Sequence, residues 1–336
     1  MLGTAVATVH ALRMHDTPDD ASGRRRAWSG YWASGRLHSC ATSFEGNYAG
    51  VIGRFWEEAF APLQPGSRVL DLASGNGALP AMLWQMHQGA VQVDAVDLAE
   101  VAPGWIRPAH DTAIRFHPGV DMEALPFAGA SFDCVASQFG FEYANRERAL
   151  AEACRVAAAD GRLRLVMHHH DSRLVQVGRE ELAHHQRLAA DDGLLPAARA
   201  VVAVLAAVRG GRPPDTAALQ AREHYNLALA ALARAAEASF APDLLLETRE
   251  AVHRQVAAVG VDPAPALDAL ERLAADLAHA RLRTVEMVEC ALDRAQLDAL
   301  LQAVRQARPQ WQVAGAELAQ AEGVLAWSLA AGPAAG

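Results

Sequence analysis

The chain has 336 residues, of which 51% are hydrophobic and 21% charged, and its formal net charge is −9. This composition is typical of a globular protein and excludes a disordered or fibrous chain. The negative charge gives no diffuse basic field, so no nucleic-acid partner is expected. No apolar run reaches the roughly 18 residues of a membrane span, and the start lacks a secretory signal, so no membrane partner is expected either.

The four cysteines are widely scattered and form no C-x-x-C pair: Cys40, Cys134, Cys154 and Cys290. Zinc sites and redox motifs use such pairs. We therefore expect reduced thiols, no metal site and a cytoplasmic location.

The N-terminal sixty residues carry two contrasting signals. The basic run 24–26 lies in a polar stretch and is expected to be a solvated, flexible tail. The stretch 28–56 is rich in aromatic residues and is too apolar for a tail. It is expected to pack as helices, either over the active cleft as a lid or on the edge of the sheet.

From residue 68 to 167 short β-type runs alternate with helical segments, which is typical of βαβ units and a parallel sheet. The predicted strands are 69–72, 91–97, 114–116, 132–137 and 162–167, and the predicted helices 78–87 and 146–158. From 172 to 290 apolar residues recur at a spacing of three and four, which predicts helices. A capping box at Asp293 and Gln296 then begins one more helix, and two β-type runs follow at 311–315 and 324–329.

These elements predict one α/β domain that carries a large insertion. The expected organisation is an N-terminal tail and helical lid over 1–60, a core over 61–171, a helical insertion over 172–290 and the end of the core over 291–332. The insertion is expected to cap the substrate or to form the interface of a homodimer.

A loop with small residues and glycines follows the first predicted strand: Ala73, Ser74, Gly75 and Gly77. Glycines let the backbone approach a ligand closely, and the next helix begins with free N–H groups. Asp97 ends the second predicted strand about 20 residues later, where a carboxylate can accept hydrogen bonds from both ribose hydroxyls. The loop alone is a weak signal, and a dinucleotide enzyme would use the same acid.

Two residues distinguish a site for a pyrophosphate from a site for a sulfonium. The third glycine of the dinucleotide pattern would fall on Pro80. Asp71 stands before the loop, where its charge would repel phosphates and favour a cationic ligand. The loop therefore favours a sulfonium cofactor.

Residues 69–77 and Asp97 resemble the first motif and the ribose-binding acid of the class I S-adenosylmethionine-dependent methyltransferases. The likeness is strongest to the small-molecule group that includes the ubiquinone/menaquinone-biosynthesis methyltransferases. Ala73 stands where the family usually has its first glycine. Three further segments are similar to parts of the family. Residues 121–127 resemble the segment that flanks the adenine, and 131–141 resemble the fourth strand with its active-site loop. Residues 149–163 resemble the helix and strand that follow. The resemblance covers 65–170 well and 290–332 loosely.

The resemblance implies a Rossmann-like sheet of seven mostly parallel strands with the last one antiparallel, and S-adenosylmethionine across the carboxyl ends of the first strands. It implies that Asp71 approaches the methionine amino group, that Asp97 holds the ribose and that Asp121 holds the adenine. The implied cofactor-binding residues are Asp71, Ala73, Ser74, Gly75, Gly77, Asp97, Leu98, Asp121, Met122, Glu123, Ser137 and Gln138.

On the acceptor side, methyl transfer needs in-line positioning of a nucleophile, and a base only where a proton must leave. His168 and His170 end the fifth predicted strand and alternate onto one face, which makes them the candidate bases. Hydrogen-bonded structural histidines are the alternative. The side chains expected to bind the acceptor are Tyr31, His38, Phe139, Phe141 and Tyr143.

The sequence thus predicts an enzyme that transfers a methyl group from S-adenosylmethionine to an O, N or C atom of a small organic acceptor. A methyltransferase that acts on a protein or nucleic acid is the alternative. A nucleic-acid enzyme would carry an Asn/Asp-Pro-Pro-Tyr-type loop where this chain has 137–140. A cofactor-binding homologue without catalytic activity also stays open, because the motifs test binding and not turnover.

Overall fold

The computed structural model describes residues 18–39, 46–110 and 112–334. A seven-stranded sheet with the order β3-β2-β1-β4-β5-β7-β6 lies at its centre. Its strands are β1 (Arg68–Leu72), β2 (Gln92–Asp97), β3 (Ile114–Pro118), β4 (Phe132–Gln138), β5 (Ala157–His168), β6 (Trp311–Gln320) and β7 (Gly323–Pro333). Strands β1 to β5 pair in parallel, and β7 runs antiparallel to both β5 and β6. The predicted sheet with one antiparallel final strand is confirmed.

Alternating side chains of the strands bury both faces of the sheet. Leu70 and Leu72 pack with α4 (Arg146–Val156) and α10 (Arg294–Ala307) on one face. Val69 packs with α2 (Gly50–Phe60) and α3 (Ala78–His87) on the other. Short 3-10 turns, η1 (Pro108–His110) and η2 (Phe141–Tyr143), follow β2 and β4. The predicted capping box that begins α10 is present, whereas α4 is two residues shorter than predicted because Ala157 and Ala158 belong to β5.

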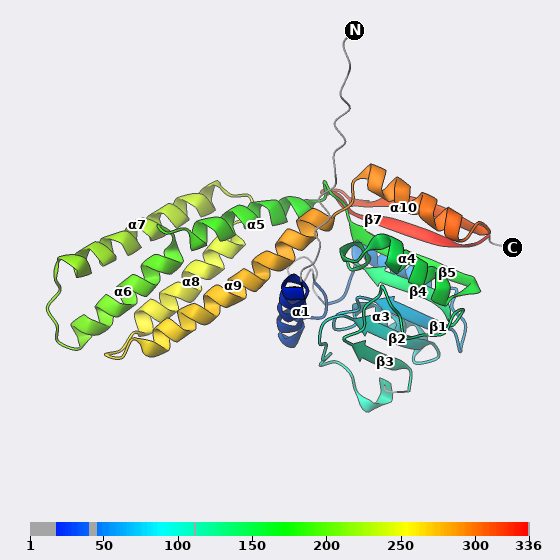
Figure 1. The fold of residues 1–336 in the computed structure, drawn as a ribbon, viewed down its shortest axis with the longest axis horizontal. Helices are drawn as coiled ribbons and strands as arrows, with labels where there is room; N and C mark the ends of the chain where they lie inside the picture. Colours follow the sequence, from blue (N-terminus) through cyan, green and yellow to red (C-terminus); the bar gives the residue numbers. More distant parts are fainter. Residues whose placement is uncertain (1–17, 40–45, 111, 335–336) are drawn as a thin grey trace, which may run out of the picture.

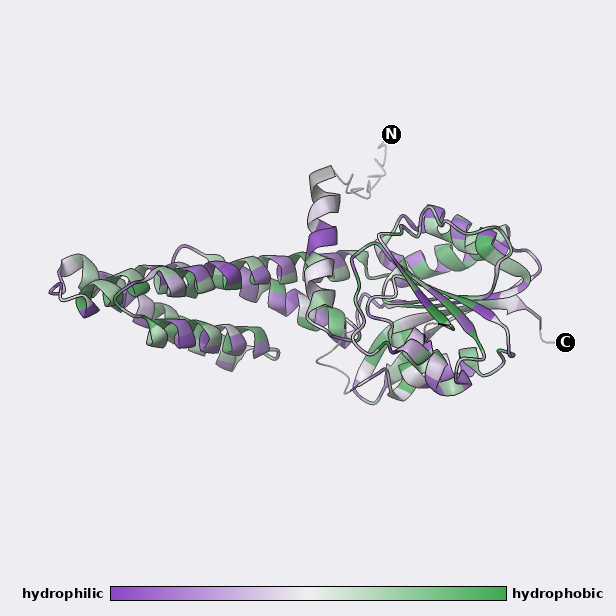
Figure 2. Ribbon diagram, turned by 90° about the horizontal axis from the view of Figure 1, so that it is seen from below, coloured by the Kyte–Doolittle hydropathy of each residue, from purple (hydrophilic) through white to green (hydrophobic). Residues whose placement is uncertain are grey.

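Residues 173–290 form a helical bundle that extends to one side of the sheet (Figures 1 and 2). Its helices are α5 (Arg173–Ala189), α6 (Leu194–Arg209), α7 (Thr216–Ala238), α8 (Asp243–Ala258) and α9 (Ala264–Cys290). Hydrophobic and hydrophilic residues alternate along these helices (Figure 2). The hydrophobic ones form a separate core that includes Val202, Leu232, Leu245 and Leu270. The bundle therefore has packing of its own and does not depend on the sheet for a core.

Helix α1 (Pro18–Ala33) lies between the bundle and the sheet, against α9 (Figure 1). The expectation that 24–26 is a flexible tail is therefore wrong. Arg24 and Arg25 are both paired with acidic side chains far away in the sequence. Within the described residues we find no helix long and apolar enough to cross a membrane.

Candidate functional site

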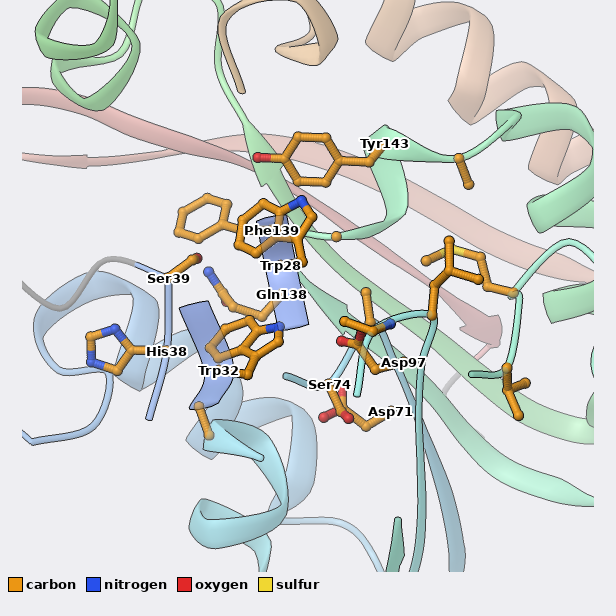
Figure 3. A pocket seen from close by; sticks show the side chains of 18 of the residues that line it. Trp28, Trp32, His38, Ser39, Asp71, Ser74, Asp97, Gln138, Phe139 and Tyr143 are labelled. Carbon is orange, nitrogen blue, oxygen red and sulfur yellow. The ribbon is translucent and has the colours of Figure 1, made fainter. Parts of the chain in front are cut away.

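A cavity of about 300 Å³ opens at the carboxyl ends of β1, β2 and β4, beside α1 (Figure 3). Strand β1 lies between β2 and β4, so the strand order reverses at this point of the sheet. Open α/β sheets bind ligands in the crevice at such a reversal. The volume is at the lower end of the range for small-molecule sites.

The loop after β1 is bent by three residues with positive φ: Ala73 (52°), Gly75 (52°) and Gly77 (84°). A Cβ on Gly75 would lie 2.4 Å from the ring of Trp32, so a glycine is needed for α1 to pack directly on the loop. A Cβ on Gly140 would meet that of Ala73 at the same distance. The glycines thus shape the loop, while Ala73 and Ser74 line the cavity.

Asp97 ends β2 and is held by two backbone N–H groups. Gly75 donates to Oδ2 and Ala99 donates to Oδ1, both at 2.8 Å. Burial raises the pKa of Asp97 to about 6, although these two hydrogen bonds act to lower it. Each carboxylate oxygen has a second lone pair, so a ligand with a pair of hydroxyls could donate to both oxygens.

Asp71 lies deeper in the same cavity and is 2% exposed. Its Oδ2 has no hydrogen-bond partner. Burial and the nearby charge of Asp97 raise its pKa. An uncompensated buried carboxylate is costly, so the cavity favours a ligand that brings a positive charge or N–H donors to Asp71.

Gln138 at the end of β4 has an unpartnered donor, whereas Asp71 has an unpartnered acceptor. The indole N–H of Trp56 donates to Oε1 of Gln138 at 2.5 Å. An indole can only donate, so this contact fixes the amide with Oε1 toward Trp56. The amide Nε2 is buried and has no partner. Gln138 lines the cavity, so a ligand acceptor is the missing partner.

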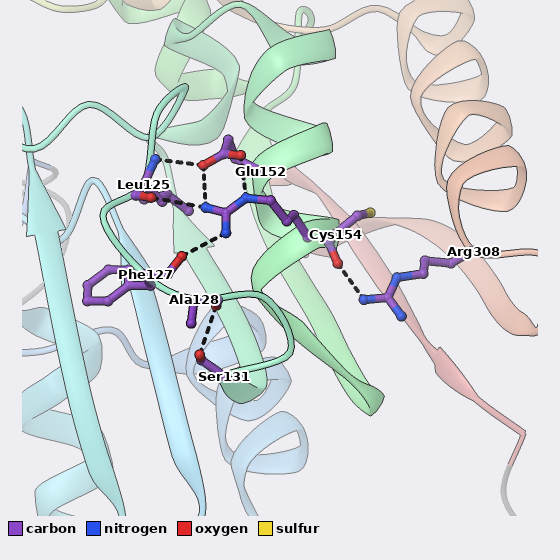
Figure 4. A network of polar contacts seen from close by, with 8 residues as sticks. Leu125, Phe127, Ala128, Ser131, Glu152, Cys154 and Arg308 are labelled. Carbon is purple, nitrogen blue, oxygen red and sulfur yellow. Dashed lines mark hydrogen bonds and ion pairs between the residues drawn. The ribbon is translucent and has the colours of Figure 1, made fainter.

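The segment after β3 closes a third side, where Asp121, Met122 and Glu123 line the cavity. Its position is fixed by α4 (Figure 4). Glu152 accepts from the Leu125 N–H at 2.7 Å, and Arg155 donates to the carbonyls of residues 125 and 127. The pKa of Glu152 is lowered by its hydrogen bonds from Arg155. The network therefore holds the segment without placing any of its own members in the cavity.

Helix α1 supplies the fourth side through Arg24, Arg25, Trp28 and Trp32. The two tryptophans belong to the stretch for which a lid was one expectation, whereas the two arginines were expected in a solvated tail. Trp28 and Trp32 stack at a centroid distance of 5.8 Å. Figure 3 shows Trp28 near Phe139 and Tyr143, and Trp32 near Ser74 and Asp71. Of the two helices that hold the aromatic-rich stretch, α1 thus borders the cavity and α2 packs on the sheet, and a lid role for α1 stays a prediction.

Most of the predicted site residues meet in this cavity: Asp71, Ala73, Ser74, Asp97, Leu98, Asp121, Met122, Glu123, Gln138, His38, Phe139 and Tyr143. Five others do not line it, besides the candidate bases. Gly75 and Gly77 bend the loop after β1 without lining the cavity. Ser137 donates its hydroxyl to the Leu72 carbonyl at 2.9 Å, Phe141 lies in the hydrophobic core, and the Tyr31 hydroxyl donates to the His38 carbonyl. These three side chains have structural partners, which corrects their predicted ligand contacts.

The candidate bases His168 and His170 also lie outside the cavity lining. His168 is 2% exposed, its Nδ1 is 2.7 Å from Oε1 of Glu142, and its ring stacks on Phe139 at 4.2 Å. β5 ends at His168, so the predicted alternation does not extend to His170, which instead contacts Arg179 at 2.9 Å. The sequence offered no signal for the Glu142 partner, which follows β4 and not β5.

Comparison with known proteins agrees with this geometry. Residues 69–161 match a family model described as a methyltransferase domain. Together with the strand order and the loop between Asp71 and Gly77, the match defines a class I S-adenosylmethionine-dependent methyltransferase domain. The family predicted from the sequence is confirmed.

The similarity to individual proteins covers only part of the chain. Over 103 residues the chain is 41% identical to a demethylmenaquinone methyltransferase of Thermus thermophilus. The matched region covers 29% of this chain and 44% of that protein. Over 123 residues it is 32% identical to a ubiquinone/menaquinone biosynthesis C-methyltransferase of Xanthomonas campestris, and this match covers 34% of this chain and 49% of that protein. The chain thus spans about half the length of the curated relatives it matches.

Two solved structures show more distant likeness. The 1,6-didemethyltoxoflavin-N1-methyltransferase of Burkholderia thailandensis is 19% identical with a TM-score of 0.36, and the match covers 50% of this chain and 68% of that one. The geranyl diphosphate C-methyltransferase of Streptomyces coelicolor is 16% identical with a TM-score of 0.33, covering 45% and 65%.

Proposed function

We propose that the protein transfers a methyl group from S-adenosylmethionine to a small organic acceptor. The observation that carries this proposal is a pair of complementary unpartnered groups in the cavity, the Oδ2 acceptor of Asp71 and the Nε2 donor of Gln138. The amino-acid end of the cofactor offers an ammonium for the first and a carboxylate for the second. The carboxylate of Asp97, at the end of the next strand, suits the ribose hydroxyls.

In this proposal the bound cofactor supplies an electrophilic sulfonium methyl. The residues of the chain bind and orient: Asp71 and Asp97 are buried acids whose pKa is raised, and a cationic ligand would stabilise their ionised form. Aromatic side chains exclude water beside them and hold the acceptor for in-line attack. No base is assigned, because the predicted histidines His168 and His170 do not line the cavity.

The acceptor half of the cavity is ring-lined, with Trp28, Phe139 and Tyr143 close together (Figure 3). Such a surface suits a flat, largely apolar molecule. The names of the curated relatives point to quinone precursors as their acceptors. We therefore propose that the acceptor is an aromatic small molecule.

Titration calorimetry with S-adenosylmethionine and S-adenosylhomocysteine tests the cofactor site. Asp97→Asn and Gln138→Leu should each weaken binding by about tenfold or more, since each removes a hydrogen bond to a charged or buried group. Asp160→Asn, which changes an exposed carboxylate of β5 outside the cavity lining, is the matched control. A folded wild-type protein that binds neither compound would contradict the cofactor site.

Transfer of a labelled methyl group from S-adenosylmethionine to demethylmenaquinol and to other aromatic acceptors tests turnover. Cofactor binding without transfer to any small acceptor would favour a binding protein or a macromolecular acceptor over the proposed activity.

A further inference from the structure

The helical insertion contacts one wall of the cavity through a side chain of α9, Glu286. Its carboxylate accepts a hydrogen bond from the Arg24 guanidinium and another from the Trp28 indole N–H, the latter at 3.1 Å. The Glu286 side chain is 12% exposed and that of Arg24 is 24% exposed, so solvent screens this contact only in part. Both partners belong to α1 and both line the cavity.

A second side chain of α9 supports the same contact from one turn earlier. Arg283 donates to the carbonyl of Ala27 at 2.9 Å, and its guanidinium lies 4.9 Å from the ring centre of Tyr31 and 5.9 Å from that of Trp28. Burial lowers the pKa of Arg283. A buried cation persists where it has such partners, because leaving it unpaired is costly.

Helix α1 has little apolar surface with which to hold itself in place. Among its side chains that the structure describes, only Ala27 and Trp32 are buried hydrophobic ones. Trp32 sits on Gly75, and Asn76 donates to two carbonyls at the end of α1 and just beyond it. The part of α1 that carries Arg24 and Trp28 is therefore held largely by polar contacts. Glu286 and Arg283 of α9 supply those on one side, and Glu100 after β2 contacts Arg25 and Ser29 on the other.

Trp28 connects these contacts with the site. Its indole N–H is bound by Glu286, while its ring lies 6.0 Å from that of Tyr143 on the acceptor side. Figure 3 shows the ring facing the same space as Phe139. The orientation of this wall of the cavity is thus set by a residue from the insertion, which lies outside the part of the chain that matches the methyltransferase model.

We propose that Glu286 and Arg283 are positioning residues through which the helical insertion holds α1, and with it Trp28, as a wall of the ligand cavity. The proposal rests on the proposed function for the identity of the ligand. A ligand that contacts α1 in its packed position stabilises that position. The packed position in turn strengthens ligand binding, because coupling between two binding events is reciprocal. Loss of the α9 contact should therefore weaken ligand binding without any change in the residues around Asp71 and Asp97.

The test uses the full chain, S-adenosylhomocysteine as the probe, and two readouts: its dissociation constant and the hydrogen exchange of the α1 amides. Glu286→Ala should weaken binding about tenfold, as expected for one charged hydrogen-bond acceptor, and speed exchange in α1. Glu286→Gln keeps an acceptor for Trp28 and should recover part of the loss. Glu289→Ala removes an exposed carboxylate from the same helix and should behave as wild type.

Wild-type affinity and unchanged α1 exchange in Glu286→Ala would overturn the proposal. If that variant fails to fold, Trp28→Phe replaces it, because this change keeps an aromatic ring and removes the indole donor; wild-type behaviour there would overturn the proposal equally. A wild-type protein that binds no S-adenosylhomocysteine would contradict the proposed function, whereas α1 exchange in the ligand-free variants would still decide the positioning role.

Discussion

The indole N–H of Trp56 fixes the amide of Gln138 through a 2.5 Å hydrogen bond across 82 sequence positions. Trp56 is fully buried on α2, outside the cavity lining. It acts only through the amide that it orients. A cavity-facing donor of β4 is thus selected by a helix that precedes the first strand of the sheet.

Replacement of Trp56 by phenylalanine should weaken S-adenosylhomocysteine binding by about three- to tenfold. The ring is retained, but the donor is lost, so the Gln138 amide can turn its oxygen toward the ligand. Calorimetry measures the change. Trp311→Phe is the control, because Trp311 is also buried and its indole N–H donates to the carbonyl of Ala159, away from the site. Equal effects of the two changes would indicate a loss of general stability.

Binding of S-adenosylhomocysteine should weaken as the pH falls through about 6. The pKa of Asp97 is raised to about 6 by burial, and its carboxylate accepts hydrogen bonds from hydroxyl groups more strongly than its protonated form does. Below that pH the affinity should fall by up to about tenfold per pH unit. Calorimetry between pH 5 and 8 tests this, and Asp97→Asn should bind weakly and lose the step that Asp97 contributes, while Asp71, whose pKa is also raised, still titrates. A flat wild-type profile would place Asp97 away from the ligand.

Asp71→Asn should stabilise the ligand-free protein while weakening cofactor binding. Burial and the charge of Asp97 raise the pKa of Asp71 above its unfolded value, so the ionised group lowers folding stability as the pH rises through that pKa. A neutral amide of the same shape removes this cost, and we expect a gain of about 1 kcal/mol at neutral pH. Urea unfolding at pH 5 and pH 8 measures it. The gain should be larger at pH 8, and a loss at both values would contradict the assignment.

The strands and the cofactor loop could be predicted because their signals are local. The bend of the loop depends on Gly75 and Gly77, and the spacing to Asp97 reflects one βαβ unit. The role of α1 could not be predicted in the same way. A basic run such as 24–26 is usually solvated, and nothing near it in the sequence indicates that Glu286, 262 positions away, will pair with Arg24. Contacts of this kind exist only after the insertion has folded back onto the sheet domain.

Gly75→Ala should displace α1 from the loop. A Cβ at this position would lie 2.4 Å from the Trp32 ring, in addition to the strain of a φ near +52°. Gly66→Ala is a matched control, since Gly66 has a φ of +87° and no atom within 4 Å of an added Cβ. Both changes should lower stability by about 1 kcal/mol through φ strain. Only Gly75→Ala should also speed hydrogen exchange in α1 and weaken S-adenosylhomocysteine binding.

His168→Phe should reduce stability and leave cofactor affinity within about twofold of wild type. The carboxylate of Glu142 is buried and accepts from both the ring and the backbone N–H of His168, at 2.7 and 2.8 Å. Loss of the ring donor leaves that carboxylate with less compensation, at a cost of about 2–4 kcal/mol. A phenyl ring can still stack on Phe139 as the imidazole does, so the cavity wall should keep its position.

Adding Glu142→Leu to His168→Phe separates the structural role of His168 from a catalytic one. If the histidine serves only to satisfy the buried carboxylate, removal of both polar groups should recover much of the lost unfolding free energy, because no unpaired charge is then left in the core. Urea unfolding gives that coupling, and methyl transfer is measured on the same proteins. Unchanged stability combined with lost methyl transfer in His168→Phe would instead return His168 to the role of base, with Glu142 holding its ring.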